Sequence, residues 1–318
     1  MRLSRSLRFV PHLLVLAFVV WCAFALRGDL QQVSLAPLLR SWNLLAVAAV
    51  LSLMNYGFRI LRWRWYLARL GHPLPLHFAG LTFIAGFAYT LSPGKVGEMI
   101  RARYYLPLGI PLPTVAGAFF AERLLDVVAM AALAALLLAD LPDYRNAVYV
   151  AAALVLVLLV LLSVLPWRSL RARFESASGL PRLVRRVLVG VTSTLAATRP
   201  LLQPVPLAMG FSMGLLAWGF EGFGLGVLSG VSPSHLGMLA AVGIYAVAVL
   251  VGALSFLPGG LGSTEAVMST LLVAHGMAFG DAVFVTLACR IVTLWLAVVL
   301  GWVAVLSLRQ RPLAPAVS

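Results

Sequence analysis

The stretch at residues 91–105, LSPGKVGEMIRARYY, interrupts an otherwise apolar chain. It follows HFAGLTFIAGFAYT (77–90), which is apolar enough to lie in a bilayer, and it opens with a Pro-Gly turn before its charged residues. A second stretch, FLPGGLGSTEAVM (256–268), repeats the Pro-Gly turn and the glutamate behind it. Because proline and glycine interrupt helices, we expect two broken segments, at 77–106 and 235–275.

The composition is that of a polytopic membrane protein. Of the 318 residues, 62% are hydrophobic and only 11% are charged, against about a quarter in soluble domains. Long apolar runs recur along the chain, so we expect one integral membrane domain over residues 1–318. The net charge of +14 lies in short segments between the apolar runs, as the positive-inside rule requires, and no nucleic-acid motif accompanies it. We therefore expect no nucleic-acid partner.

Six apolar runs are long enough to cross a bilayer, at residues 10–26, 42–62, 113–139, 147–165, 207–230 and 280–307. The arginines gather on one side of these spans only if each broken segment returns to the face it entered from. We therefore predict an all-α polytopic membrane protein with six full spans plus two re-entrant Pro-Gly helical hairpins and cytoplasmic termini. This threading places on the cytoplasmic side Arg59, Arg62, Arg101 and Arg103. It leaves within the membrane only Lys95, Arg123 and Arg290.

The connection at 166–206 is the one long polar stretch. Within it, LPRLVRRVLVGVTSTLAA (180–197) alternates arginines with leucines and valines. This pattern favours a helix in the cytoplasmic interface, with its arginines toward anionic head groups.

A spacing pattern indicates an internal duplication. A glutamate is followed after 11 residues by a glycine, and the glycine after 14 more residues by an arginine. This spacing occurs at Glu98, Gly109 and Arg123, and again at Glu265, Gly276 and Arg290. We assign approximately 42–139 to one repeat and 207–307 to the other. On the predicted threading the repeats are inverted, an arrangement that builds two gates around a central site and suits alternating access.

Each Pro-Gly turn is expected to leave a helix N-terminus inside the membrane. The free N–H groups and positive dipole end of such a terminus favour an anion, and non-helical backbone at this depth is tolerated only beside protein or water. The alternative is a plain helix break whose amides are satisfied by water.

The remaining intramembrane charges leave their roles open. Glu122, Arg123 and Asp126 share one helix and will not face lipid, so they form either an internal ion-pair clamp or a substrate or proton contact. Arg290 matches Arg123 without acidic neighbours in sequence, and its partner could be Glu98, Glu265, Glu221 or a ligand. Glu221 is either a buried protonated carboxyl or a proton carrier.

Catalytic, metal and cofactor motifs do not emerge from the sequence. No Ser/His/Asp grouping, Cys/His pair or P-loop is evident, and Cys22 and Cys289 lie in apolar runs without metal-ligand spacing. We therefore expect a transporter rather than an enzyme, with neither metal nor cofactor.

These motifs resemble those of the transmembrane family named for lysylphosphatidylglycerol synthase, over about residues 10–308. The resemblance rests on LSPGKVGEMIRARYY, on AFFAERLLDVVAM (118–130), on FLPGGLGSTEAVM and on CRIVTLWL (289–296). It implies a flippase-like membrane domain that moves lipids or lipid-linked groups in a bacterial or archaeal inner membrane. Bifunctional relatives carry a cytosolic aminoacyl-transferase domain after this region. Only RQRPLAPAVS follows here, so lysyl-lipid synthesis is not expected.

The resemblance implies functional roles for twelve positions, Pro93, Gly94, Gly97, Glu98, Glu122, Arg123, Asp126, Pro258, Gly259, Gly262, Glu265 and Arg290. To these candidate substrate-binding residues we add Lys95, Arg101 and Glu221. The leading hypothesis is translocation of a lipid or lipid-linked anionic head group across the inner membrane, with membrane lipids as partners.

Two other hypotheses remain open. One is a proton-coupled carrier of a small soluble anion, which would share the architecture. The other is a non-transporting membrane scaffold for lipid or glycan modification, which would bring a lipid-modifying enzyme as partner.

Overall fold

The computed structural model describes residues 41–138, 142–177, 179–234 and 236–309. Over these ranges the chain is helical and contains no strand. The first half comprises α4 (Trp42–Arg69), α5 (Leu76–Phe87), η2 (Pro93–Arg101), α6 (Ala102–Tyr105), η3 (Leu106–Leu108), α7 (Leu112–Leu138) and α8 (Pro142–Val164). The second half comprises α9 (Trp167–Ser176), α10 (Arg182–Thr198), η4 (Arg199–Leu202), α11 (Pro204–Leu228), η5 (Ser229–Val231), α12 (Met238–Leu254), η6 (Pro258–Gly260), α13 (Ser263–Ala274), α14 (Phe279–Arg290), the π-helical turn η7 (Ile291–Trp295) and α15 (Leu296–Arg309).

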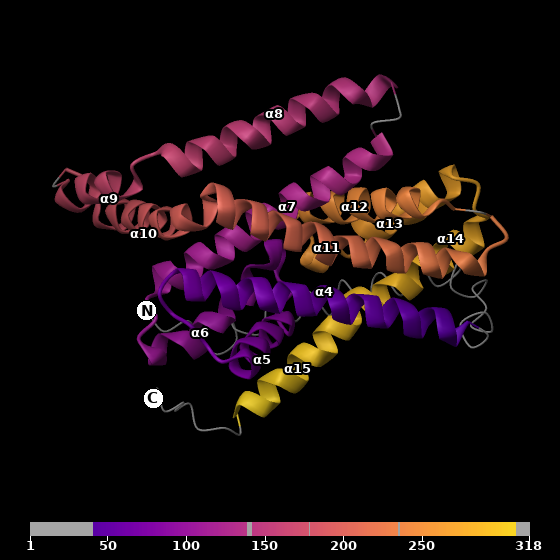
Figure 1. The fold of residues 1–318 in the computed structure, drawn as a ribbon, viewed down its shortest axis with the longest axis horizontal. Coiled ribbons are helices and arrows are strands. Elements are labelled where there is room, and N and C mark those ends of the chain that lie inside the picture. Colours follow the sequence, from indigo (N-terminus) through magenta and orange to yellow (C-terminus); the bar gives the residue numbers. More distant parts are fainter. Residues whose placement is uncertain (1–40, 139–141, 178, 235, 310–318) are drawn as a thin grey trace.

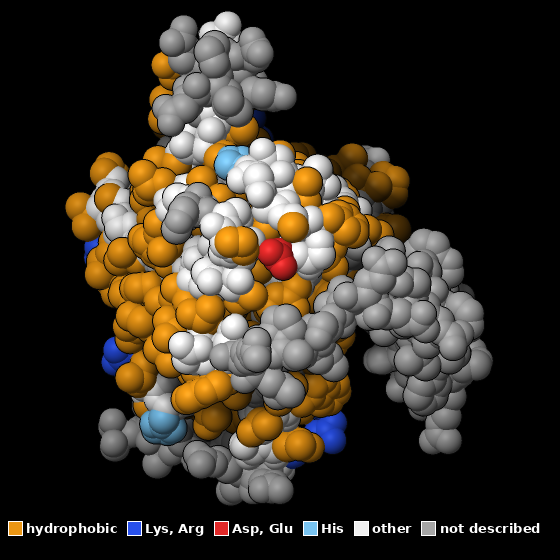
Figure 2. Space-filling view, turned by 90° about the vertical axis from the view of Figure 1, so that its right-hand side faces the viewer, with side chains coloured by type: hydrophobic (Ala, Val, Ile, Leu, Met, Phe, Trp, Pro, Cys, Tyr) orange, Lys and Arg blue, Asp and Glu red, His pale blue; other side chains and the backbone are white. Residues whose placement is uncertain are grey.

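Three helical stretches are long and apolar enough to cross a bilayer, namely Trp42–Arg69, Pro204–Val231 and Phe279–Arg309. A fourth is present if the end of α8 and α9, which meet at a bend of 63°, count as one span. Three of the six predicted spans coincide with the long stretches, whereas the run at 10–26 lies outside the described residues. Figure 2 shows one face of the molecule, where hydrophobic side chains cover most of the described surface.

Both segments with a Pro-Gly turn are broken as the sequence predicts. The first divides into α5 and the irregular helix η2, which pack against each other, and the second into α12 and α13, which also pack against each other. Proline at the start of η2 and of η6 precedes residues with non-helical backbone angles. The breaks therefore arise from the local backbone preferences of proline and glycine.

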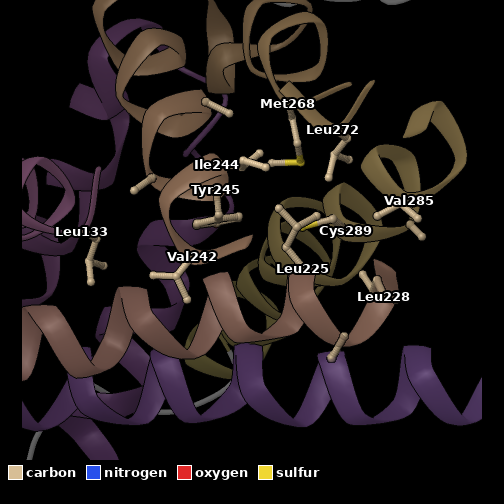
Figure 3. Packing of buried hydrophobic residues seen from close by; sticks show 14 of the residues in the cluster. Leu133, Leu225, Leu228, Val242, Ile244, Tyr245, Met268, Leu272, Val285 and Cys289 are labelled. Atoms are coloured by element: carbon tan, nitrogen blue, oxygen red, sulfur yellow. The ribbon is translucent and has the colours of Figure 1, made fainter. Parts of the chain in front are cut away.

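Helix α11 organises the centre of the bundle. It lies beside α4 over much of its length and also packs on α7, α12 and α14 (Figure 1). Figure 3 shows the hydrophobic cluster between α11, α12, α13 and α14, in which Leu225, Tyr245, Met268 and Cys289 meet. A second cluster, around Trp63, joins α4, α5 and α7.

The segment predicted to lie in the membrane interface forms the helix α10. It packs on α7 and α9, and its residues Arg182, Leu183, Val187 and Val191 are exposed. Arginines and large apolar side chains therefore share an exposed surface of α10, as an interfacial helix requires.

Candidate functional site: a cavity between two Pro-Gly turns

The two Pro-Gly turns meet inside the bundle although 165 residues separate Pro93 from Pro258 in the sequence. Their contact is close, since a Cβ built on Gly259 would lie 2.7 Å from Leu91 Cδ2. Each turn also contains two consecutive residues in the left-handed region. These are Gly94 and Lys95 (φ 60° and 56°) in the first turn, and Gly259 and Gly260 (φ 62° and 66°) in the second. The two turns therefore share a backbone conformation as well as a sequence pattern.

Lys95 and Gly260 occupy equivalent positions in the two turns, but the position of Gly260 has no room for a side chain. A left-handed conformation costs a residue other than glycine roughly 1–2 kcal/mol, and Lys95 adopts it. At Gly260 a Cβ would lie 2.6 Å from Thr264 Oγ1 and 3.1 Å from Gly252 Cα, so no side chain fits. The first turn thus holds a lysine with a strained backbone conformation, whereas the second turn packs tightly against α12.

Seven buried or half-buried charged side chains form a network behind the first turn. The network comprises Arg59 and Arg62 from α4, Glu98 and Arg101 from η2, and Glu122, Arg123 and Asp126 from α7. Arg101 donates hydrogen bonds to Glu98 Oε2 (2.9 Å) and Glu122 Oε2 (3.0 Å). Arg123 Nη2 lies 2.6 Å from Glu122 Oε1 and 3.1 Å from Asp126 Oδ2, and Arg62 also pairs with Asp126.

Three arginines that the sequence assigns to the cytoplasmic side are buried in this network. Arg59, Arg62 and Arg101 are at most 5% exposed and are paired with carboxylates. Arg101 is also sandwiched between aromatic rings, 4.4 Å from the centroids of Trp63 and Phe83. Removing charges from water is tolerated only when they are paired, so the three carboxylates Glu98, Glu122 and Asp126 account for the burial of these arginines.

A smaller network supports the second turn. Arg290 Nε lies 2.5 Å from Glu265 Oε1, and Arg290 Nη2 donates a 2.7 Å hydrogen bond to the carbonyl of Gly259. The other oxygen of Glu265 accepts a 2.6 Å hydrogen bond from the Gly262 amide at the start of α13. Of the partners that the sequence leaves open for Arg290, Glu265 is therefore the one it contacts.

The duplication detected in the sequence has a counterpart in these contacts. Arg123 and Glu98, which match Arg290 and Glu265 in the repeat, also approach each other, at 3.8 Å. The repeat spacing places Cys289 and Thr293 where α7 carries Glu122 and Asp126. Since these residues are uncharged, the second network contains fewer charges than the first.

A cavity of about 370 Å³ lies where the turns meet. Seven of the fifteen predicted residues line it, namely Gly94, Lys95, Arg123, Asp126, Glu221, Gly259 and Arg290. Lys95 Nζ lies 5.6 Å from the ring centroid of Trp218, and no carboxylate of the described residues is within 4 Å of this ammonium group. Such an ammonium group, at the wall of a cavity, can bind an anion by charge and hydrogen bonding.

The other eight predicted residues lie outside the cavity wall, namely Pro93, Gly97, Glu98, Arg101, Glu122, Pro258, Gly262 and Glu265. Several of them hold the wall in place, as Glu98 and Glu122 do through Arg123. A Cβ at Gly97 would lie only 2.6 Å from the Tyr89 carbonyl, and the Gly97 amide donates to Ser92 Oγ. Gly97 therefore allows the turn itself to close and does not contact the cavity.

Several residues that line the cavity are not predicted from the sequence. Arg59, expected on the cytoplasmic side, lies within α4, which continues past the predicted end at residue 62 to Arg69. The apolar periodicity through WRWYLA (63–68) is the signal for this longer helix. Tyr56, Trp218 and Tyr245 also line the cavity. Aromatic residues inside apolar helices carry no sequence signal that separates a cavity wall from a core. Within the described ranges, no three His, Cys, Asp or Glu side chains are grouped as metal ligands.

Comparisons with known proteins identify the family. The family model described as the lysylphosphatidylglycerol synthase TM region matches residues 10–301. A UPF0104 membrane protein of Methanothermobacter thermautotrophicus is 27% identical over 305 residues, which cover 91% of this chain and 89% of the relative. A UPF0104 membrane protein of Pyrococcus horikoshii is 39% identical over 62 residues, only 20% of this chain and 18% of that relative. The chain therefore belongs to the lysylphosphatidylglycerol synthase transmembrane-region family and is a multi-pass membrane protein.

Proposed function

We propose that this protein is a flippase-like translocator of a lipid or lipid-linked anionic head group. The observation that carries the proposal is the cavity between the two Pro-Gly turns, whose wall carries more cationic than anionic side chains and many apolar ones. The cations are Lys95 of η2, Arg123 of α7, Arg290 of α14 and Arg59 of α4. Among them Lys95 is the cation left without an ion pair in the described residues, so it is the first contact for an incoming anion.

The rim of the cavity suits the apolar part of a lipid. Val127, Leu254 and Phe256 line it and are 47%, 74% and 71% exposed. In a membrane protein, such exposed apolar side chains are compatible with contact to acyl or isoprenoid chains. A lipid could therefore place its head group between the turns while its tail stays in the bilayer.

The proposed architecture is six spans and two re-entrant hairpins arranged as inverted repeats, with both termini in the cytoplasm. Its support is the shared backbone conformation of the turns at Gly94-Lys95 and Gly259-Gly260, together with the matched Arg/Glu pairs. Two similar gates that meet at one cavity can open it alternately to either side of the membrane. The hinge of the second gate is the π-helical turn after Arg290, since π-bulges often occur at functional sites.

Reconstitution tests the proposal. Vesicles containing the protein receive fluorescent phosphatidylglycerol, phosphatidic acid or an isoprenoid phosphate, and a membrane-impermeant quencher reports movement between leaflets. We expect the wild type to accelerate movement of at least one of these lipids, and Lys95→Ala with Arg290→Ala to abolish the acceleration. Arg171→Ala is the matched control, because Arg171 is exposed on α9 and pairs only with Glu175 among the described residues.

The alternatives give different outcomes in the same vesicles. Equal movement of every lipid by wild type and double variant would refute the role of the cavity. Uptake of labelled inorganic phosphate without lipid movement would identify a carrier of a small soluble anion. Loss of cellular function without any transport would favour the scaffold.

A further inference from the structure

Glu221 is a buried carboxyl group on α11 at the wall of the cavity. It is 4% exposed, and the hydroxyl of Tyr245 on α12 donates a hydrogen bond to it. Over the part of the chain that the structure describes, it is the one buried carboxyl with no Lys, Arg or His nitrogen within 4 Å. Glu98, Glu122 and Asp126, by contrast, each meet at least two arginines.

Lys95 is the complementary group on the wall of the same cavity. Its ammonium lies 5.6 Å from the ring of Trp218, which is one helical turn before Glu221 on α11. Both Lys95 and Glu221 line the same cavity, and neither has an ion pair among the described residues. The cavity wall therefore has one cation without an ion pair and one carboxyl group that can balance it.

The groups that face Glu221 come from every element around it. They are Tyr56 and Arg59 of α4, Lys95 of η2, Tyr245 of α12, Cys289 and Arg290 of α14, and Arg123 and Asp126 on the cavity wall from α7. Figure 3 shows Tyr245 and Cys289 in the packed cluster above α11. Arg123 and Arg290 are already paired with carboxylates, which leaves Lys95 as the balancing charge.

We propose that Glu221 takes up a proton when an anionic head group occupies the cavity beside Lys95, so that the protein moves one proton together with each anion. This inference rests on the proposed function. The anion neutralises Lys95, and Glu221 would then remain as an uncompensated buried charge, which is strongly unfavourable. A proton from water removes that charge, and the Tyr245 hydroxyl can accept a hydrogen bond from the acid as readily as it donates one to the carboxylate.

Proton uptake on binding tests the inference with purified full-length protein in nanodiscs of phosphatidylcholine. The probe is dihexanoylphosphatidylglycerol, a phosphodiester whose own charge stays constant between pH 5 and 8. Titration calorimetry in two buffers of different ionisation enthalpy gives the number of protons taken up per probe bound. We expect about one proton for the wild type within this range, none for Glu221→Gln, and an unchanged value for the control Glu175→Gln, a surface carboxylate on α9.

Tyr245→Phe is the second variant and keeps the carboxyl group in place. It should still take up a proton, at a different pH from the wild type, because the hydrogen bond that favours one charge state is gone. Binding without proton uptake in the wild type, or equal uptake in Glu221→Gln, overturns the inference and leaves the proposed function standing. Failure of the wild type to bind the probe or any other anionic lipid overturns both.

Discussion

The Arg290 guanidinium contacts Glu265 at 2.5 Å and the Gly259 carbonyl at 2.7 Å, and so joins α14 to the second Pro-Gly turn. The matching residues Arg123 and Glu98 approach to 3.8 Å beside the first turn. In both halves, therefore, an arginine on a later helix lies within 4 Å of the glutamate that follows the turn. We regard this pair as the structural unit that the chain contains twice.

Replacing Arg290 with lysine should loosen the second turn. A single ammonium group cannot reproduce the planar fork that bonds Glu265 and the Gly259 carbonyl together. We expect faster amide hydrogen exchange at residues 258–262, measured by mass spectrometry in nanodiscs. Arg309→Lys, at the exposed end of α15, should leave exchange unchanged. Equal exchange in Arg290→Lys and wild type would show that this contact does not hold the turn.

Arg101 and Arg103 give a matched test of the buried network. Arg101→Ala removes the hydrogen bonds that Arg101 donates to the buried carboxylates Glu98 and Glu122, and we expect a loss of roughly 3–5 kcal/mol in unfolding free energy. Arg103 is exposed two residues away, so Arg103→Ala should change stability by less than about 0.5 kcal/mol. Thermal unfolding in detergent compares the two. Equally small losses of stability in the two variants would show that Arg101 is exposed at the protein surface, as Arg103 is.

Lys95→Gly should separate stability from function. Glycine relieves the left-handed strain at this position, which favours the folded protein by about 1 kcal/mol, while the cation is lost from the cavity. We expect a higher melting temperature together with weaker binding of anionic lipid. Lys95→Ala should lose the same binding without the gain in stability. A lower melting temperature for Lys95→Gly would mean that the lysine side chain stabilises the turn.

Gly260→Ala should destabilise the protein by roughly 1–3 kcal/mol, because the added methyl group would meet Thr264 Oγ1 at 2.6 Å in a strained conformation. Gly280→Ala is the control, since nothing lies within 4 Å of its Cβ position near the start of α14. Thermal unfolding distinguishes them. Equal melting temperatures for the two variants would contradict the close packing of the second turn on α12.

Local features of the sequence predicted the breaks but not the charge pairing. Proline and glycine fix the turns at residues 93–94 and 258–259 by their own backbone preferences, and the residues of the 11-and-14 spacing include an Arg/Glu pair within 4 Å in each half. The burial of Arg101 is not predicted, because the positive-inside rule counts the arginines of each loop and does not consider ion pairs. The partner of Arg101, Glu122, lies 21 residues away in the sequence. Contacts such as Tyr245 with Glu221 join separate helices, and only the packing of α11 on α12 brings them together.

We propose that the two Pro-Gly turns together build one anion site. A cryo-electron microscopy structure of the protein in nanodiscs that contain phosphatidylglycerol is the most direct test. We predict head-group density in the cavity, with the phosphate within ion-pair distance of Lys95 Nζ and facing Arg290, and with acyl density leaving past Leu254 and Phe256. Turns that lie apart, or a cavity that stays free of phosphate while lipid binds elsewhere, would contradict the account.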